Sequence, residues 1–502
     1  MTALLDQAGL LRLREALVNA GFTTEGIAQR LGDEGSKALA RNDFREALKR
    51  TTGGDPLDTL IRLFIVRQAE PEAAIAAALK PLTLEMARQG GIIHGDEAGA
   101  DLKPYGRWWV MADLPAQPGR PLPADHVLGV GGASTTLTAS TIRRRVGTAL
   151  DLGTGCGVQA LHLSTHAGSV TGTDVSPRAL AFARANATLN GLDWELIRGD
   201  LTEAVPGRRF NLVVSNPPFV VGPGTATHTY RDSGRAGDAV CAELAAAAAS
   251  LLNPGGTMQF LANWMHVKGE DWQDRVAGWF AGSGLDVWAI QREVQDPLDY
   301  VRLWLADASE EDDPVRAARW LDWLEAHDVS AIGFGLVTAR ASGHDDPTVV
   351  CEDLRQQVAP PMGDRVAEWF DRREWLRAND LLAAKLKKAD GLQLRQEASW
   401  GAQGLRDGGT AGGEGSGGGS GEGNGWAVDR QLLALTEGLR WVEEIDPLIL
   451  AVVSGCEGTL PLSEVLGLLA AAHEVPYDDL KKAILPAVDH LVERGMLTPC
   501  EQ

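Results

Sequence analysis

The chain has 502 residues, of which 44% are hydrophobic and 23% charged, and its formal net charge is −21. This length is too great for one compact core and predicts two to four domains of an ordinary globular protein. The acidic balance opposes a large contact with a phosphate backbone unless a local basic face outweighs it.

Targeting and membrane signals are missing from the sequence. The first residues, MTALLDQAGLLRLREAL, mix acidic and basic side chains with leucines, so no signal peptide is expected. The longest apolar run, around Leu244–Leu252, is far shorter than the roughly 20 residues that a bilayer requires. The five cysteines are scattered without CxxC spacing, which indicates neither a disulfide framework nor a zinc site. We therefore expect a cytoplasmic protein with no membrane partner.

Residues 1–120 predict a mostly helical N-terminal domain. Apolar residues recur at three- and four-residue steps from Thr24 to Val66. The segments GIIHGDEAG and GRWWVMADL then predict two strands joined by a glycine-rich turn. Helices followed by such a hairpin resemble a winged-helix module, and we expect this domain to dock the substrate. Trp108 and Trp109 lie on the second strand, and we expect one ring in the core and the other half covered.

Residues 121–345 alternate strands with helices, which predicts an α/β domain whose parallel sheet is covered on both faces. The clearest helix is Arg178–Asn190, with Ser176 as its N-cap and Gly191 just beyond its end. A helical insert, Val315–Ala326, separates the last two strands. Seven strands are expected, at Thr148–Leu152, Ser169–Asp174, Trp194–Arg198, Asn211–Ser215, Thr257–Ala262, Val287–Arg292 and Ala331–Ala339.

Residues 346–502 predict a C-terminal domain. It begins with helices at Asp364–Trp375 and Asp380–Lys388, followed by the strand-like segment LQLRQEA. The glycine-rich tract 401–425 cannot bury a core and predicts a disordered loop. Because QLLALTEGLRWVEEI beyond it is again strand-like, we favour an excursion between two paired strands over a plain interdomain linker. The acidic tail, Pro447–Leu497, predicts two or three helices in a winged-helix-like arrangement that contacts protein rather than DNA.

A cofactor site is indicated where the first strand of the α/β domain ends. Asp151 ends this strand, and Gly153, Gly155 and Gly157 follow at the start of a helix. Glycine is required where the backbone turns sharply and lies close to a ligand. The dinucleotide fingerprint GxGxxG would need glycine at position 158, where valine stands instead.

Two further acids follow the next strands. Asp174 is positioned to accept hydrogen bonds from both ribose hydroxyls, and Asp200 to accept from an adenine amino group, with the Leu201 backbone nearby. A glycine loop, a ribose acid and an adenine acid in this order resemble the class I S-adenosylmethionine (SAM)-dependent methyltransferases, over roughly residues 130–340. The resemblance implies a seven-stranded Rossmann-like fold and SAM as the cofactor, with Thr154 and Val175 among its contacts.

The fourth strand ends in Asn216-Pro217-Pro218-Phe219. The two prolines fix the chain and remove backbone donors, so the Asn216 side chain and the Pro217 carbonyl stand at the carboxyl end of the strand. A planar NH2 group that donates to both oxygens is held for attack on a sulfonium methyl, and Phe219 can stack on it. This resembles the NPP(F/Y) motif of methyltransferases that act on adenine N6, guanine N2 and the glutamine amide. The resemblance implies a catalytic role for these four residues and, for Asn216, a cofactor contact as well.

Other candidate residues are weaker. Tyr230 and Arg231 fall where these enzymes bind their target; Arg231 either holds a substrate anion or, as we favour, forms a surface ion pair. The segment Val130–Leu137 either caps the methionine end of the cofactor or is an ordinary loop. His162 and His166 have metal-like spacing but lack a third ligand, so we expect helix packing and no metal.

Two macromolecular acceptors fit the motif. The acidic charge and the segment YRDSG favour a glutamine amide in a protein such as a translation factor. Phe219 and the LAN segment at 261–263 are similar to the rRNA guanine-N2 enzymes and favour an exocyclic amine in rRNA or DNA. A small-molecule acceptor and a catalytically silent SAM-binding scaffold are the alternatives, and the intact acids and Asn216 argue against the scaffold.

Overall fold

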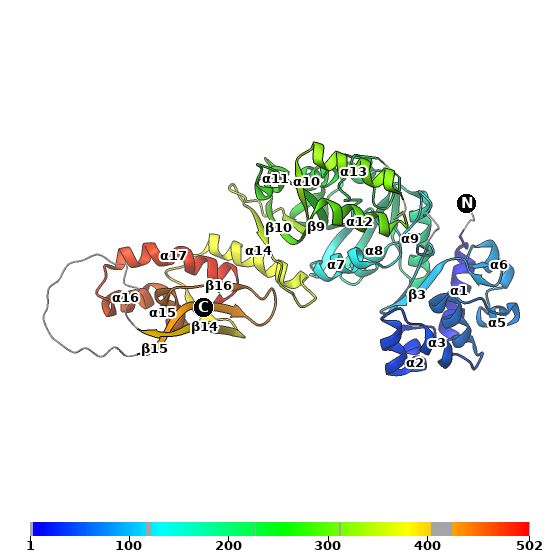
Figure 1. Cartoon of the computed structure of the whole chain (residues 1–502), viewed down its shortest axis with the longest axis horizontal. Helices are drawn as coiled ribbons and strands as arrows, with labels where there is room; N and C mark the ends of the chain where they lie inside the picture. Colours follow the sequence, from blue (N-terminus) through cyan, green and yellow to red (C-terminus); the bar gives the residue numbers. More distant parts are fainter. Residues whose placement is uncertain (1–3, 117–121, 226, 311–312, 403–423, 501–502) are drawn as a thin grey trace. The chain divides into compact units, whose positions relative to one another are not determined.

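The computed structural model describes residues 4–116, 122–225, 227–310, 313–402 and 424–500. The chain divides into two compact units, Met1–Arg355 and Gln356–Gln502, which Figure 1 colours from blue to yellow-green and from yellow to red. Over the described ranges, no helix is both long and apolar enough to cross a membrane.

The first unit begins with short helices, as the periodicity predicts. Helix α1 (Gln7–Asn19) is capped by Asp6, whose carboxylate accepts from the Gly9 N–H at 2.8 Å, and it buries Leu10, Leu13 and Leu17 on one face. The helical elements are α1 (Gln7–Asn19), α2 (Thr24–Leu39), α3 (Arg45–Arg50), α4 (Pro56–Leu60), the π-helix η1 (Ile61–Val66), α5 (Glu72–Ala78) and α6 (Leu84–Gln89).

Two separate hairpins follow these helices, so the expectation of a single one was wrong. Strand β1 (Ile93–His94) pairs with β2 (Glu97–Ala98), and β3 (Asp101–Tyr105) pairs with β4 (Trp108–Ala112). Two hairpins form because each pair of strands has its own turn with a glycine of positive φ, 63° at Gly95 and 55° at Gly106.

Neither Trp108 nor Trp109 reaches the core, which corrects the expected burial of one ring. Both rings are half-buried. The Trp109 indole N–H donates to the Phe22 carbonyl at 2.6 Å, and the Trp108 ring lies edge-on against His162 with 4.8 Å between centroids.

A mixed, mostly parallel sheet of eight strands forms the centre of the first unit, in the order β12-β10-β11-β9-β8-β5-β6-β7. Strands β5, β6, β7, β8 and β9 run parallel to one another, and β11 is antiparallel to both β9 and β10. The elements are α7 (Gly132–Ser140), β5 (Val146–Leu152), α8 (Val158–Leu163), β6 (Ala167–Asp174), α9 (Pro177–Asn190), β7 (Glu195–Arg198), the 3-10 helix η2 (Leu201–Ala204), β8 (Phe210–Ser215), α10 (Ala239–Leu251), β9 (Leu252–Val267), α11 (Trp272–Gly278), β10 (Asp286–Gln295), α12 (Pro297–Asp307), α13 (Pro314–Ala326), β11 (Val329–Arg340) and β12 (Val349–Asp353).

All seven expected strands are present, but the count of seven was wrong. The eighth strand, β12, runs parallel to β10 at one side of the sheet. Its residues are only partly buried, so it lacks the continuous apolar run that identifies an inner parallel strand. Helix α12 was also not anticipated; with α13 it buries Tyr300, Trp320 and Leu324 against Ile332 of β11.

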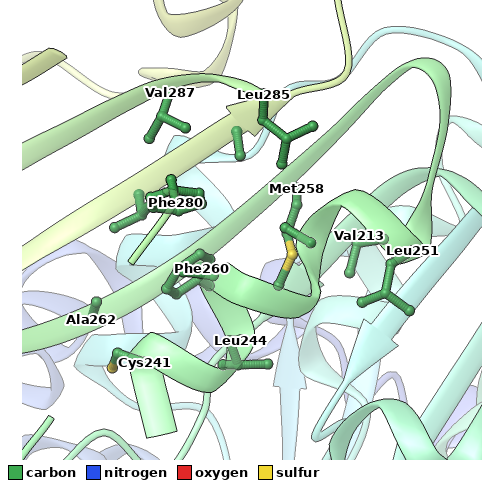
Figure 2. Packing of buried hydrophobic residues seen from close by; sticks show 14 of the residues in the cluster. Val213, Cys241, Leu244, Leu251, Met258, Phe260, Ala262, Phe280, Leu285 and Val287 are labelled. Atoms are coloured by element: carbon green, nitrogen blue, oxygen red, sulfur yellow. The ribbon is translucent and has the colours of Figure 1, made fainter. Parts of the chain in front are cut away.

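The main core lies between the sheet and the helices α10 and α11. Figure 2 shows Cys241, Leu244 and Leu251 of α10 beside Met258 and Phe260 of β9. All five are at most 2% exposed. Burial of this kind contributes about 1.5–3 kcal/mol per large side chain and fixes the strands whose carboxyl ends carry the site.

The second unit contains two three-stranded sheets, in the orders β17-β13-β18 and β14-β15-β16. The segments on either side of the glycine tract pair as expected, from Leu392 opposite Leu435 to Ala402 opposite Asn424, and the tract is not a linker between units. Residues 403–423 themselves lie outside the described residues. The elements are α14 (Gly363–Ala378), β13 (Lys385–Lys388), β14 (Leu392–Ala402), β15 (Asn424–Leu435), β16 (Val442–Glu444), α15 (Pro447–Gly455), β17 (Glu457–Pro461), α16 (Leu462–Ala472), α17 (Tyr477–Glu493) and β18 (Leu497–Pro499).

The predicted helix Asp380–Lys388 is wrong, because residues 381–383 form only a turn and Lys385–Lys388 form β13. Leu386 is 1% exposed between outward-facing lysines, and pairing with β17 and β18 overrides the local helix propensity. The winged-helix character of the two terminal domains stays a prediction.

Candidate active site

A cavity of about 690 Å³ opens at the carboxyl ends of the central parallel strands. It brings together the segments that the sequence predicts to bind the cofactor and the methyl acceptor, although they are far apart along the chain. Its lining includes Gly153–Cys156 after β5, Asp174–Ser176 after β6, Gly199–Leu201 after β7 and Asn216–Val220 after β8. This is the position where open α/β sheets bind ligands.

Two of the expected cofactor residues support the glycine loop from outside the cavity lining. Asp151 is fully buried, and its Oδ2 accepts from the Thr154 hydroxyl at 2.6 Å and from the Ala160 N–H at 3.0 Å. Burial raises the pKa of Asp151 to about 7. Gly157 has φ of 90°, and a Cβ there would lie 2.6 Å from the Trp194 ring, so close packing requires this glycine.

Asp174 both shapes the glycine loop and faces the cavity. Its Oδ2 accepts from the Gly155 N–H at 2.9 Å and its Oδ1 from the Ser176 N–H at 2.8 Å. Burial raises the pKa of Asp174. Each carboxylate oxygen has a second lone pair, so two ribose hydroxyls can still donate to this residue. Val175 beside it is 40% exposed in the cavity wall.

Asp200 has a partner that sequence reasoning missed. One of its oxygens accepts from Arg235 Nη2 at 3.0 Å, and Arg235 also donates to Glu243 at 2.5 Å. Arg235 comes from the loop after the NPPF motif and lines the same cavity. No spacing rule pairs residues 200 and 235, because only the fold brings the two loops together.

The NPPF segment presents an unsatisfied acceptor. Asn216 Oδ1 is buried and finds no hydrogen-bond partner among the described residues. The Pro217 carbonyl accepts from the Phe219 N–H at 2.8 Å and retains its second lone pair. Leaving a buried acceptor without a donor costs about 1–3 kcal/mol, so a ligand with an N–H group fits this position.

The acceptor side of the cavity is aromatic. Phe219 lies edge-to-face with Trp304 of α12, with 6.0 Å between the ring centroids. The Tyr230 hydroxyl donates to Asp307 at 2.8 Å, and burial together with this carboxylate raises the pKa of Tyr230. Trp304 and Asp307 carry no recognisable motif and were missed.

Arg231 does not form the surface ion pair that we favoured, because the residue is 2% exposed. Its guanidinium lies 3.1 Å from Glu310 and 3.3 Å from Asp232, and it also donates to the Trp304 carbonyl. These contacts tie the loop after the NPPF motif to the segment after α12. A direct contact between Arg231 and the substrate stays a prediction.

His126 is another residue that the sequence did not single out. It is 4% exposed, lines the cavity, and has no partner for Nε2 among the described residues. Burial lowers the pKa of His126, which favours its neutral form. Its ring lies 6.0 Å from that of Tyr230, so it belongs to the same aromatic wall.

The remaining candidates are His162, His166 and the segment Val130–Leu137. His162 packs on Trp108 and meets the Tyr105 hydroxyl at 3.0 Å, as expected, and burial lowers its pKa to about 4. In the part of the chain that the structure describes, no group of three or more His, Cys, Asp or Glu side chains is placed to hold a metal ion. The segment Val130–Leu137 includes the start of α7, at Gly132, and contributes Val130–Ser134 to the cavity wall.

Comparisons with known proteins agree with the motifs. Residues 131–272 match the family model described as the methyltransferase small domain. Residues 19–103 and 367–499 match two models that are each described as a domain of unknown function, DUF7059 and DUF7782. Residues 131–272 are therefore similar to the methyltransferase small domain, which supports SAM as the cofactor.

Two relatives share this central part. The release factor glutamine methyltransferase of Deinococcus radiodurans is 37% identical over 157 residues, which are 29% of this chain and 56% of that protein. The ribosomal RNA small subunit methyltransferase C of Salmonella typhimurium is 30% identical over 201 residues, 39% of this chain and 55% of that protein. The chain thus spans about half the length of the curated relatives it matches.

A solved structure of a T. thermophilus 16S rRNA N2 methyltransferase, in complex with AdoMet and guanosine, is 19% identical. It aligns over 36% of this chain and 44% of that one with a TM-score of 0.24.

Proposed function

We propose that this chain is a SAM-dependent N-methyltransferase that transfers a methyl group to a planar nitrogen. The observation that carries the proposal is the unsatisfied Asn216 Oδ1, next to the Pro217 carbonyl, in the same cavity as the glycine loop and Asp174. Two acceptors on one rigid turn match the two N–H bonds of an amino or amide group.

The residues would act by orientation and electrostatics. When bound, SAM supplies an electrophilic methyl group. Asn216 Oδ1 and the Pro217 carbonyl would hold the acceptor nitrogen in one orientation, and both oxygens favour the positive charge that develops on it. The backbone of the glycine loop and the Asp174 side chain would hold the cofactor. The hydrogen bond from Thr154 to Asp151 stabilises the conformation of the loop.

An exocyclic amine of a nucleobase is the acceptor that the cavity favours. Phe219, Trp304 and Tyr230 give the acceptor side a wall of aromatic rings, which suits a flat base better than a short aliphatic amide. A single base turned out of its strand needs no large phosphate contact, which is compatible with the acidic charge.

Labelling distinguishes the acceptors. Lysate from a strain lacking this protein is incubated with tritiated SAM and either the natural protein or its Asn216→Ala variant, then digested with RNase or protease. Other methyltransferases of the lysate give the same background in both samples, and we expect label above this background only with the natural protein, released by RNase. Extra label released by protease alone would identify a protein amide as the acceptor, and no extra label in any fraction would contradict the proposed activity.

A further inference from the structure

The N-terminal domain contributes to the wall of the catalytic cavity. Asp101 and Lys103 of β3 both line it. They lie two residues apart on a strand and so face the same side, while Leu102 between them is fully buried on the other side. The Lys103 ammonium lies 3.0 Å from Asp101 Oδ2, and Arg67 holds the other Asp101 oxygen at 3.2 Å.

One set of contacts holds this hairpin beside the glycine loop. Met111 of β4 is opposite Leu102 in the hairpin register. Asn186 of α9 accepts from the Met111 N–H at 2.8 Å and donates to the Met111 carbonyl at 2.9 Å. The same Asn186 amide donates to the carbonyl of Cys156, within the glycine loop, at 2.7 Å. One side chain therefore spans the distance between hairpin and loop.

A second contact runs through Gly129. A Cβ at this position would lie 3.3 Å from Ala112 Cβ and 3.5 Å from Asp101 Oδ2, so the backbone before α7 packs directly against the hairpin. Helix α7 in turn is bound to α8, the helix that follows the glycine loop, because Gln159 donates to the Ser134 carbonyl at 2.8 Å. Asp101 and Lys103 thus lie at the end of the cavity that the glycine loop and the start of α7 define.

Lys103 contacts fewer carboxylates than the other described cations of the cavity wall. Among the described lysine and arginine residues that line the cavity, Arg231 meets Glu310 and Asp232, and Arg235 meets Asp200 and Glu243. Lys103 meets one carboxylate, that of Asp101, and its side chain is 42% exposed. It is therefore available to an anionic group of a ligand.

We propose that Lys103 and Asp101 bind the amino-acid end of the cofactor, Lys103 its carboxylate and Asp101 its ammonium group. This rests on the proposed function, and it gives residues of the N-terminal domain a part in cofactor binding. The alternative site for the carboxylate is the first turn of α7, whose residues also line the cavity.

Two ligands separate these possibilities. S-adenosylhomocysteine carries the amino-acid end, whereas 5′-methylthioadenosine keeps the adenosine and the sulfur but lacks that end. Isothermal titration of the full chain gives the ratio of the two affinities. We expect Lys103→Met to weaken S-adenosylhomocysteine roughly ten- to a hundredfold, the usual range for a lost charge-assisted contact, and to leave 5′-methylthioadenosine unchanged.

Matched variants complete the test. Lys103→Arg keeps the charge and should retain most of the preference for S-adenosylhomocysteine over 5′-methylthioadenosine. Lys37→Met is the control, because Lys37 also pairs with one carboxylate, Glu34 at 3.0 Å, but lies outside the cavity lining. Equal weakening of both ligands by Lys103→Met would show general damage to the hairpin and overturn the inference. Unchanged affinity for both ligands would overturn it in favour of α7. Natural protein that binds neither ligand would instead contradict the proposed function.

Discussion

The side-chain amide of Asn186, on helix α9, makes two hydrogen bonds with the backbone of Met111, on strand β4 of the N-terminal hairpin. It accepts from the Met111 N–H and donates to the Met111 carbonyl. One helical turn further on, Asn190 repeats the arrangement with Trp109, accepting from its N–H at 2.9 Å and donating to its carbonyl at 2.8 Å. Within the first compact unit, these two amides join the N-terminal hairpin to α9 at a fixed register.

Replacing Asn186 with alanine should lower the free energy of unfolding by about 2–5 kcal/mol, because it leaves the Met111 N–H, the Met111 carbonyl and the Cys156 carbonyl unsatisfied in the interior. Urea denaturation measures the change. Thr188→Ala on the exposed side of the same helix is the control and should shift the midpoint little. A loss below 1 kcal/mol would mean that water or a backbone shift replaces the amide.

Asn216→Ala should reduce methyl transfer by at least a hundredfold and leave the affinity for S-adenosylhomocysteine within a few-fold. The variant removes one of two acceptors that orient the nitrogen, and such groups act mainly in the transition state. Single-turnover transfer and isothermal titration measure the two quantities. Retained transfer in this variant would show that the acceptor nitrogen is held elsewhere.

The stability of the fold should depend on pH through Asp151. Burial raises the pKa of Asp151 in the folded chain to about 7, above its value in the unfolded chain. The folded state therefore binds more protons than the unfolded state between these two values, and this contribution to stability is present below about pH 4 and lost as pH rises through 7. Asp151→Asn removes the titration but keeps an oxygen for Thr154 and Ala160.

The difference in unfolding free energy between natural protein and Asp151→Asn measures this effect and cancels other titrating groups. It should fall by a few kcal/mol from pH 4 to pH 8 and then stay level. A difference that stays constant over this range would show that Asp151 is ionised throughout.

Arg231→Met should destabilise the chain by about 1–3 kcal/mol, because it removes the buried cation between Glu310 and Asp232 and leaves both acids only Arg316, which lies 2.6 Å from Glu310 and 3.6 Å from Asp232. Arg302→Met is the matched control, since Arg302 pairs with Asp299 but is 77% exposed. Chemical denaturation compares the two variants. Normal stability in Arg231→Met together with a raised KM for the acceptor would assign Arg231 to substrate binding.

The sequence was most informative where signals are local. The inner strands of the sheet were predicted because each is a short apolar run that ends in a turn or an acid, and the glycine loop, Asp174 and the NPPF segment follow three of them. These segments meet in one cavity because parallel strands end at the same side of a sheet.

Sequence reasoning failed where the partner lies far along the chain. Strand β12 is only half-buried, and β13 is a strand because β17 and β18 pair with it. Lys103, His126 and Trp304 reach the cavity from a hairpin, a connecting segment and an inserted helix, and none of them belongs to a motif. Their role becomes visible only when the fold places them beside the glycine loop and the NPPF turn.

The two asparagines of α9 also have a consequence for the N-terminal domain on its own. Strand β4 ends its two-stranded sheet, so its outward N–H and C=O groups at Trp109 and Met111 would form an open edge if α9 were removed. Open edges recruit strands from other molecules. A fragment that ends after this hairpin should therefore self-associate, whereas the same residues in the full chain have that edge capped by side-chain amides.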